Sequence, residues 1–137
     1  MVEQSLVFIK PDGVKRRLVS EIMGRFEKRG FTFKRCELRQ LNSDEVDAHY
    51  EEHVNQPFFP RLKEFILSGP IFIMVLEGEK VIETVRTMVG PTDALVAPPG
   101  TIRGDLALSK GENVIHASDS VESAQREIKN FFGTLEH

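Results

Sequence analysis

Residues Pro70–Leu76, which read PIFIMVL, decide the fold of this chain. Six apolar side chains follow one another after the proline, and no polar residue among them marks a side that faces solvent. A short apolar run that begins directly after Gly69 and Pro70 predicts a strand that is covered on both sides or heavily packed. We therefore place this strand in the centre of a sheet that is covered by helices.

Further strands and helices surround this run in the sequence. A buried strand is predicted over Ser5–Ile9, and a half-buried one over Phe31–Lys34 continues to Leu38 after a bulge or bend at Arg35–Cys36. A last strand holds His116. Helical stripes and capping residues predict helices over residues 19–28, 42–50, 60–69 and 81–89, and a final helix with its apolar face at Ala124, Ile128, Phe131 and Phe132.

The stretch 90–105 contains three prolines and three glycines, which predict irregular structure. A loop of this length in a compact domain is usually functional. The complete order of elements predicts an α/β chain of the α+β type, a ferredoxin-like βαββαβ sandwich in which helices cover a four-stranded antiparallel sheet. The same topology serves RNA-binding and regulatory domains, so the fold does not identify the function.

Length and composition describe an ordinary globular protein of 137 residues, predicted to form one domain over 1–134. Residues 135–137 resemble the start of a vector-encoded tag. A formal net charge of −3 excludes a general polyanion-binding surface, so an anionic ligand must meet a local group of cations. The single Cys36 excludes an internal disulfide and fits a reducing compartment. Without a signal peptide or a membrane-length apolar stretch, we expect a cytoplasmic protein with no membrane partner.

One histidine stands out near the end of the chain. Residues 113–120 read NVIHASDS, so a short apolar run carries His116 toward small polar residues that can cap a helix. Glu127 lies two turns into that helix and can fold back to hold one imidazole nitrogen. A carboxylate there fixes the tautomer and leaves the other nitrogen with a free lone pair, as a histidine nucleophile requires. Taken alone, the pair favours a buried histidine that a neighbouring carboxylate satisfies, and other segments of the chain must overturn that interpretation.

Cationic side chains are the available means of binding phosphate, because the chain contains no Gly-x-x-x-x-Gly-Lys-Ser/Thr loop. Lys10 ends the first apolar strand, and Arg103 lies beside glycines that let the backbone come close. The planar guanidinium of arginine matches phosphate oxygens with two hydrogen bonds. The candidates for phosphate contact are Lys10, Arg86, Thr92 and Arg103.

Three segments in this order resemble the nucleoside diphosphate kinase family: Lys10–Gly13 (KPDG), Pro99–Asp105 (PGTIRGD) and residues 113–120. The resemblance runs in register from Leu6 to Phe132 and implies the ferredoxin-like fold. It implies transfer of the terminal phosphoryl group of a nucleoside triphosphate to a nucleoside diphosphate, by a ping-pong mechanism through a phosphohistidine at His116. It also implies that Nδ1 attacks and that Mg²⁺ arrives on the nucleotide, with no metal ligands from the chain itself.

The resemblance implies roles for further residues. Glu127 holds the imidazole with Ser118 as its support, and Tyr50 lies near the transfer centre. Phe58 stacks on the nucleobase, and Leu62 lies on the same wall. The residues that face the phosphates or the sugar are Lys10, Arg86, Thr92, Arg103 and Asn113. Base stacking reads any base, so we expect nucleotides of every base to be accepted and no specific nucleic acid to be bound.

Some positions depart from the family pattern. Ala117 follows the histidine where most members have glycine, which is tolerated if its φ is negative. Thr92 lacks the Asn-Pro that commonly follows it, and Lys110 stands near the base where an apolar residue is frequent. The family forms hexamers or tetramers, and the short C-terminal tail favours a hexamer.

Two alternatives remain open at this point. His49 and His53 have the i, i+4 spacing of metal ligands, but no nearby Glu or Cys completes a set, so we predict no metal site there. The chain could also be a non-catalytic ferredoxin-like module that binds nucleotide or nucleic acid. The negative charge, and strands without a combined aromatic and basic signature, argue against that module.

Overall fold

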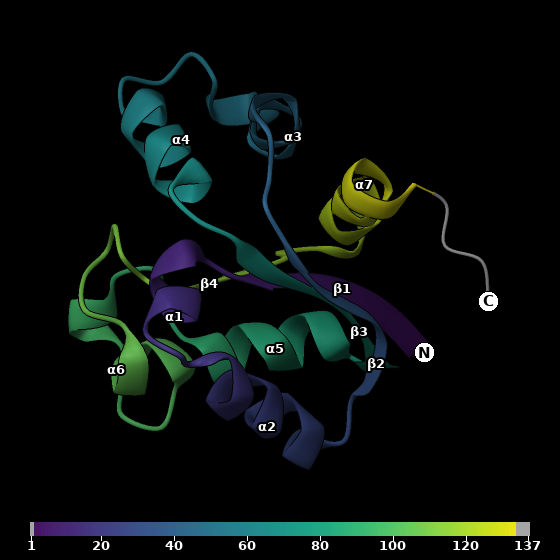
Figure 1. The fold of residues 1–137 in the computed structure, drawn as a ribbon. Helices are drawn as coiled ribbons and strands as arrows, with labels where there is room; N and C mark the ends of the chain where they lie inside the picture. The colour runs from purple at the N-terminus through teal and green to yellow at the C-terminus, as the bar shows by residue number, and fades with distance from the viewer. Residues whose placement is uncertain (1, 134–137) are drawn as a thin grey trace.

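The computed structural model describes residues 2–133, which fold around a four-stranded antiparallel sheet with the order β2-β3-β1-β4 (Figure 1). The strands are β1 (Val2–Ile9), β2 (Thr32–Arg39), β3 (Ile71–Glu79) and β4 (Ile115–Ala117). The helices are α1 (Pro11–Lys15), α2 (Val19–Arg29), α3 (Ser43–His49), η1 (Glu51–His53), α4 (Phe59–Leu67), α5 (Val81–Val89), η2 (Ala94–Val96), α6 (Ile102–Leu106) and α7 (Val121–Phe132). The predicted ferredoxin-like sandwich is confirmed.

Strand β3 is the central strand that its sequence predicts. Ile71, Ile73 and Val75 belong to one apolar cluster, whereas Met74 and Leu76 belong to the cluster on the opposite face. Successive side chains of a strand point to opposite faces, so each face of β3 needs its own cover. Helices α2 and α5 cover one face, and α3, α4 and α7 cover the other (Figure 1).

The predicted helix boundaries follow local hydrogen bonding. Asn42 and Glu45 form a reciprocal capping box at the start of α3, with N–H to oxygen distances of 2.9 and 3.0 Å. Gly30 ends α2 at a φ of +99°. Ser120 accepts a hydrogen bond from the backbone N–H of Ser123 and so caps α7. This last cap fixes the helix that carries Glu127.

The prediction that residues 90–105 lack regular structure is wrong, because η2 lies in that stretch and α6 begins in it. Thr101 begins α6: its hydroxyl donates to the Pro98 carbonyl at 2.7 Å and accepts from the Gly104 N–H at 2.9 Å. A Cβ at position 104 would run into the Pro98 carbonyl, so glycine permits this tight start. Local capping therefore outweighs the number of prolines and glycines here.

Smaller differences concern boundaries. The irregularity in β2 falls between Phe33 and Arg35, one residue before the predicted position, and β1 begins at Val2. After Lys10 the chain enters α1, which Pro11 starts at a position where its missing N–H costs no hydrogen bond. In residues 2–133 no helix has both the length and the apolar character that a membrane span needs. The possible tag remnant lies outside the described residues, and the domain boundary at 134 stays a prediction.

Candidate active site

A cavity of about 840 Å³ lies between the α3–α4 hairpin and the end of the sheet that carries β4. Ten of the eleven sequence-predicted site residues line this cavity. They are His116, Glu127, Lys10, Tyr50, Phe58, Leu62, Arg86, Thr92, Arg103 and Asn113. Ser118 lies behind this lining and is completely buried. The structure thus brings together side chains that the sequence spreads over more than a hundred positions.

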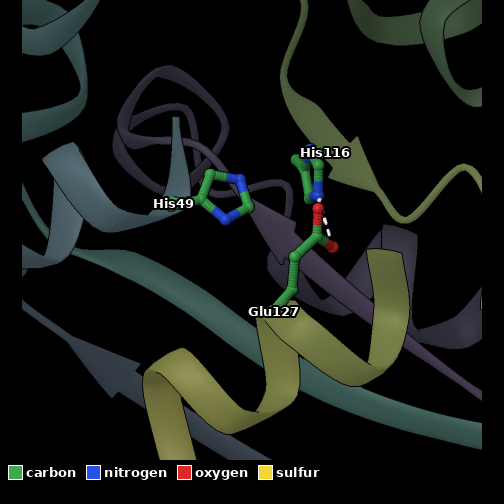
Figure 2. Close-up of side chains that lie close together, drawn as sticks. All are labelled: His49, His116 and Glu127. Carbon is green, nitrogen blue, oxygen red and sulfur yellow. Dashed lines mark hydrogen bonds and ion pairs between the residues drawn. The ribbon is translucent and has the colours of Figure 1, made fainter. Parts of the chain in front are cut away.

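His116 and Glu127 meet as the sequence predicts (Figure 2). His116 Nε2 lies 3.1 Å from Glu127 Oε1, and the imidazole stacks on the ring of Phe8 with the centroids 4.9 Å apart. An ionised carboxylate can only accept a hydrogen bond, so Nε2 carries the proton and Nδ1 holds the lone pair. Within residues 2–133, Nδ1 makes no hydrogen bond to another group of the protein. One nitrogen is therefore held, and the other is available to a ligand.

Glu127 is itself fixed by Ser118. The serine hydroxyl accepts a hydrogen bond from the backbone N–H of Leu6 at 3.0 Å and lies 2.7 Å from Glu127 Oε1. Since a hydroxyl has one proton, it donates to this nearer, charged oxygen rather than to the Leu6 carbonyl at 3.1 Å. Arg126 pairs with the other carboxylate oxygen at 3.9 Å. Strand β1 thereby orients the carboxylate that orients the histidine.

Asp12 holds the turn that delivers His116, and the sequence reasoning gave it no role. Val114 has a φ of +73°, an unfavourable conformation for a β-branched residue, and it lies outside β4. Asp12 Oδ2 accepts from the Val114 N–H at 3.1 Å, and the Val114 carbonyl accepts from the Lys10 N–H at 2.7 Å. Burial raises the pKa of Asp12, although the Val114 N–H favours its charged form. The position of Asp12 in the KPDG segment is the sequence signal from which a role could have been predicted.

Lys10 and Asn113 form a buried pair at the base of the cavity. Lys10 Nζ donates to Asn113 Oδ1 at 2.7 Å, and Asn113 Nδ2 donates to the Thr92 carbonyl at 3.2 Å. Burial, with a smaller contribution from the charge of Arg103, lowers the pKa of Lys10 to about 8. The ammonium is thus charged at pH 7 but poorly solvated, and it keeps donors for an anionic ligand.

Arg103 is held by the backbone on three sides. Its guanidinium donates to the carbonyls of Asn113, Gly90 and Ile115 at 3.3, 3.2 and 2.6 Å. A guanidinium has five N–H donors, so two remain for a ligand. Burial, and then the charge of Arg86, lowers the pKa of Arg103 to about 10. Arg86 lies at the same end of the cavity and donates to the Ala117 carbonyl at 3.4 Å.

Aromatic and apolar side chains form the opposite wall of the cavity. Phe58 is 52% exposed and lines the cavity, whereas its neighbour Phe59 is buried in the core. Leu62 lies one turn further along α4, and Lys110 reaches the cavity from the segment before β4. Burial raises the pKa of the Tyr50 hydroxyl, and the charge of Glu127 raises it further. Ala117 lies in β4 without a positive φ, so it takes the place of glycine without strain.

His49 is a site residue that the sequence reasoning did not place. Its ring is 4% exposed and meets the ring of His116 edge to face, with the centroids 4.6 Å apart. Its Nδ1 is buried and has no hydrogen-bond partner. Burial, and then the proximity of His116, lowers the pKa of His49 well below its usual value, so the ring is neutral at pH 7. The i, i+4 spacing pairs it with His53, for which the sequence predicts no metal site, whereas the fold packs its ring against His116.

Known proteins resemble this chain along nearly its whole length. Residues 3–137 match the sequence model of the family described as nucleoside diphosphate kinase. Nucleoside diphosphate kinases of Hyperthermus butylicus and Saccharolobus solfataricus are 56% and 52% identical, and in both cases the match covers 96% of this chain. It covers 92% and 96% of those two proteins.

Solved structures give the same result. The apo nucleoside diphosphate kinase of Encephalitozoon cuniculi superposes with a TM-score of 0.94 at 38% identity, over 96% of this chain and 90% of that one. The halophilic enzyme of Halobacterium salinarum, solved in complex with CDP, has a TM-score of 0.94 at 41% identity, over 98% of this chain and 90% of that one.

Proposed function

The chain belongs to the nucleoside diphosphate kinase family, and we propose that His116 is the residue that carries the phosphoryl group between its two nucleotides. The enzyme is a phosphotransferase that moves the terminal phosphoryl group of a nucleoside triphosphate to a nucleoside diphosphate. A non-catalytic module is not favoured, because relatives across the whole chain are kinases.

One observation carries the assignment of His116: Nε2 is held by Glu127 Oε1 at 3.1 Å, which leaves the lone pair on Nδ1 of a side chain that lines the cavity. In the first half-reaction Nδ1 attacks the terminal phosphorus, an N–P bond forms, and the P–O bond to the leaving diphosphate breaks with its electron pair on oxygen. In the second, a terminal oxygen of another nucleoside diphosphate attacks the same phosphorus and the N–P bond breaks. One site serves donor and acceptor in turn, so ping-pong kinetics follow.

Glu127 contributes more than orientation. As Nδ1 forms its bond to phosphorus, the ring gains positive charge, and a carboxylate on Nε2–H stabilises that charge. Glu127 is 4% exposed, so little solvent screens this interaction. Ser118 keeps the carboxylate in place at 2.7 Å and acts as a positioning residue.

Cations that line the same cavity suit a phosphate chain. Phosphoryl transfer depends mainly on positioning and on neutralising charge, which Lys10, Arg86 and Arg103 can supply. Asn113 accepts a hydrogen bond from Lys10 and donates one to the Thr92 carbonyl, and these two residues complete the proposed contacts to the ribose hydroxyl and the phosphates. Tyr50 borders the transfer centre through its contact with the His49 ring.

Phe58 and Leu62 form the proposed base-binding wall. A half-exposed ring offers one face for stacking, and stacking accepts any base. This arrangement supports a broad range of nucleotides.

Mg²⁺ is proposed to arrive on the nucleotide. Among residues 2–133, the one group of three potential ligands contains two imidazoles and a single carboxylate, whereas Mg²⁺ prefers oxygen donors. The chain therefore fits a Mg²⁺ that phosphates and water hold, and the ion supplies charge neutralisation on the phosphates.

Exposed apolar side chains support a homo-oligomer, for which we favour a hexamer over a tetramer. Leu38 on the edge strand β2 and Leu95 and Val96 on η2 are 61%, 79% and 69% exposed. Two separate apolar surfaces suit an assembly with two kinds of interface. Light scattering on the eluting protein measures the subunit number. The free Cys36 and the nucleotide substrates suit a reducing compartment, and we propose the cytoplasm.

Labelling with γ-³²P ATP tests the role of His116. We expect a label on the protein that survives alkali and is lost in acid, as a phosphoramidate should be. The His116→Ala variant should take up no label, while His53→Ala, which alters a different cavity histidine, should keep it. A labelled His116→Ala protein would place the phosphoryl group elsewhere and refute the assignment.

A further inference from the structure

Three potential metal ligands that line the cavity converge from distant parts of the sequence. His49 ends α3, His116 lies on β4 and Glu127 lies on α7, and one ligand atom of each lies within 4.8 Å of the others (Figure 2). The spacing of His49 and His53 predicted no complete ligand set. The fold supplies one that omits His53 and adds two residues from the C-terminal part of the chain.

His49 has a polar atom that the protein itself leaves unused. Nδ1 is buried without a hydrogen-bond partner, and the ring packs against Phe8 and Phe131 with centroids 5.3 and 5.4 Å away. Buried polar atoms in native proteins almost always have a partner, so this one calls for an explanation. The ring of His116 stands edge to face at 4.6 Å, which brings a second imidazole to the same place.

Two imidazoles and one carboxylate are the donor set of zinc-class cations, which take three protein ligands and leave a further position open. We propose that His49, His116 and Glu127 bind a zinc-class divalent cation reversibly, and that the bound cation blocks phosphorylation of His116. The cation would replace the hydrogen bond between His116 Nε2 and Glu127 Oε1, which are already 3.1 Å apart. Small side-chain movements then bring the three donors to coordination distance.

Inhibition follows because a cation on Nε2 of His116 changes the protonation of Nδ1 in the same ring. A neutral imidazole has a single N–H, so a cation on Nε2 leaves the proton on Nδ1. Nδ1 then lacks the lone pair with which it attacks phosphorus. The cationic side chains that line the same cavity, Lys10, Arg86, Arg103 and Arg126, repel a metal ion, so binding should be reversible rather than permanent. Binding is independent of the proposed function, whereas the inhibition rests on it.

Co²⁺ titration of the full chain measures binding, because its visible spectrum reports low-coordinate nitrogen and oxygen ligation. We expect a saturable spectrum that excess Zn²⁺ abolishes. His49→Phe keeps an aromatic ring in the core without its nitrogens and should weaken affinity at least about tenfold, since even outer partners of a metal site contribute that much. His53→Ala is the matched control and should bind like wild type. Equal affinity of wild type and His49→Phe, or no saturable binding up to about 1 mM, would overturn the proposal.

Imidazole NMR signals of the wild type decide the outcome if His49→Phe does not fold. Broadening by Co²⁺ at His49 and His116 supports the site, and broadening confined to His53 and His137 overturns it.

Inhibition is measured as Zn²⁺-dependent slowing of γ-³²P labelling in wild type and His49→Phe at equal nucleotide. The slowing should be at least about tenfold stronger in wild type, because effects of Zn²⁺ on the nucleotide are common to both. Equal slowing in the two proteins would overturn the proposed inhibition. If the wild type takes up no label even without Zn²⁺, only the proposed function is refuted.

Discussion

The floor and the wall of the cavity are built in different ways. The floor, His116, Glu127, Ser118, Asn113 and Arg103, is buried except for the partly exposed histidine, and every member makes a hydrogen bond within the protein. The wall, Phe58, Leu62 and Lys110, is partly or fully exposed. Phe58 reaches its neighbour His53 only through a tilted ring contact at 5.6 Å.

This difference separates chemistry from recognition. Attack in line on phosphorus tolerates little displacement of the reacting nitrogen, so the floor is held by strands β1 and β4 and by capped helices. A base that stacks on a ring needs only an apolar face, which a mobile side chain can offer. Changes in the floor should therefore alter rates, and changes in the wall should alter affinity.

Replacing His116 by alanine is the strongest test of the floor. Turnover should fall at least about 10⁴-fold, because losing the nucleophile of a covalent mechanism typically costs this much or more. ADP affinity and the melting temperature should stay near wild type, since a partly exposed side chain at a strand end is lost. Near-normal turnover of the purified variant would end the proposed division between floor and wall.

Replacing Glu127 by glutamine should slow phosphorylation of His116 without preventing it. The amide oxygen can still accept the Nε2–H, but the charge that stabilises the attacking ring is gone. A charged hydrogen bond is worth about twice a neutral one, so we expect a loss of about one to two decades in rate. Single-turnover labelling quenched at high pH measures it, and ADP affinity should be unchanged. Wild-type rates would mean that another group orients the histidine.

The sequence predicts most of the fold because its signals are local. Apolar runs mark β1 and β3, Asn42 and Glu45 mark the start of α3, and Gly30 marks the end of α2. Helix α6 was missed because its start depends on the Thr101 side chain bridging to Pro98 and Gly104. Counting prolines and glycines does not reveal such a bridge.

Site residues that belong to a sequence motif were predictable, whereas residues that only the fold brings to the site were not. The sequence pairs His116 with Glu127, which the structure brings to 3.1 Å. Nothing in the spacing shows that His49 approaches both of them, because only the tertiary fold brings the end of α3 against β4, where the two imidazole rings lie with their centroids 4.6 Å apart. The positive φ of Val114 was equally hidden, since the hydrogen bond that holds this residue comes from Asp12, about a hundred residues earlier.

A pH titration tests the proposed contact of Lys10 with the phosphates. Lys10 donates a hydrogen bond to Asn113 of the floor. Its pKa of about 8 means that the protonated fraction falls from about nine tenths at pH 7 to about one tenth at pH 9. The Kd for ADP should therefore rise about tenfold over this range, and Lys10→Arg should remove the rise. Unfolding is not the cause: the unfolded lysine keeps its proton up to pH 10.5, so this group's contribution to stability increases between pH 8 and 10.5. A flat wild-type profile would contradict a Lys10 that binds phosphate and titrates near pH 8.

Replacing Phe58 by alanine should have the smallest effect and should separate the wall from the floor. Stacking on an aromatic ring is worth about 1–3 kcal/mol, and a ring that is 52% exposed belongs at the lower end, so the Kd for ADP should rise about fivefold. The labelling rate at saturating ATP should not change, because no atom of the floor has moved. In the wild type, kcat/KM for adenine, guanine, cytosine and uracil nucleotides should lie within about two decades, since stacking differences are about 1–2 kcal/mol. Comparing Phe58→Ala with Phe58→Leu distinguishes stacking from mere apolar cover, because leucine keeps the cover and loses the ring face. A fall in the saturated labelling rate of Phe58→Ala would show that the wall positions the phosphates as well. A wild-type preference of about five decades in kcat/KM for one base would reveal a contact to the edge of that base, with Lys110 as the first residue to replace.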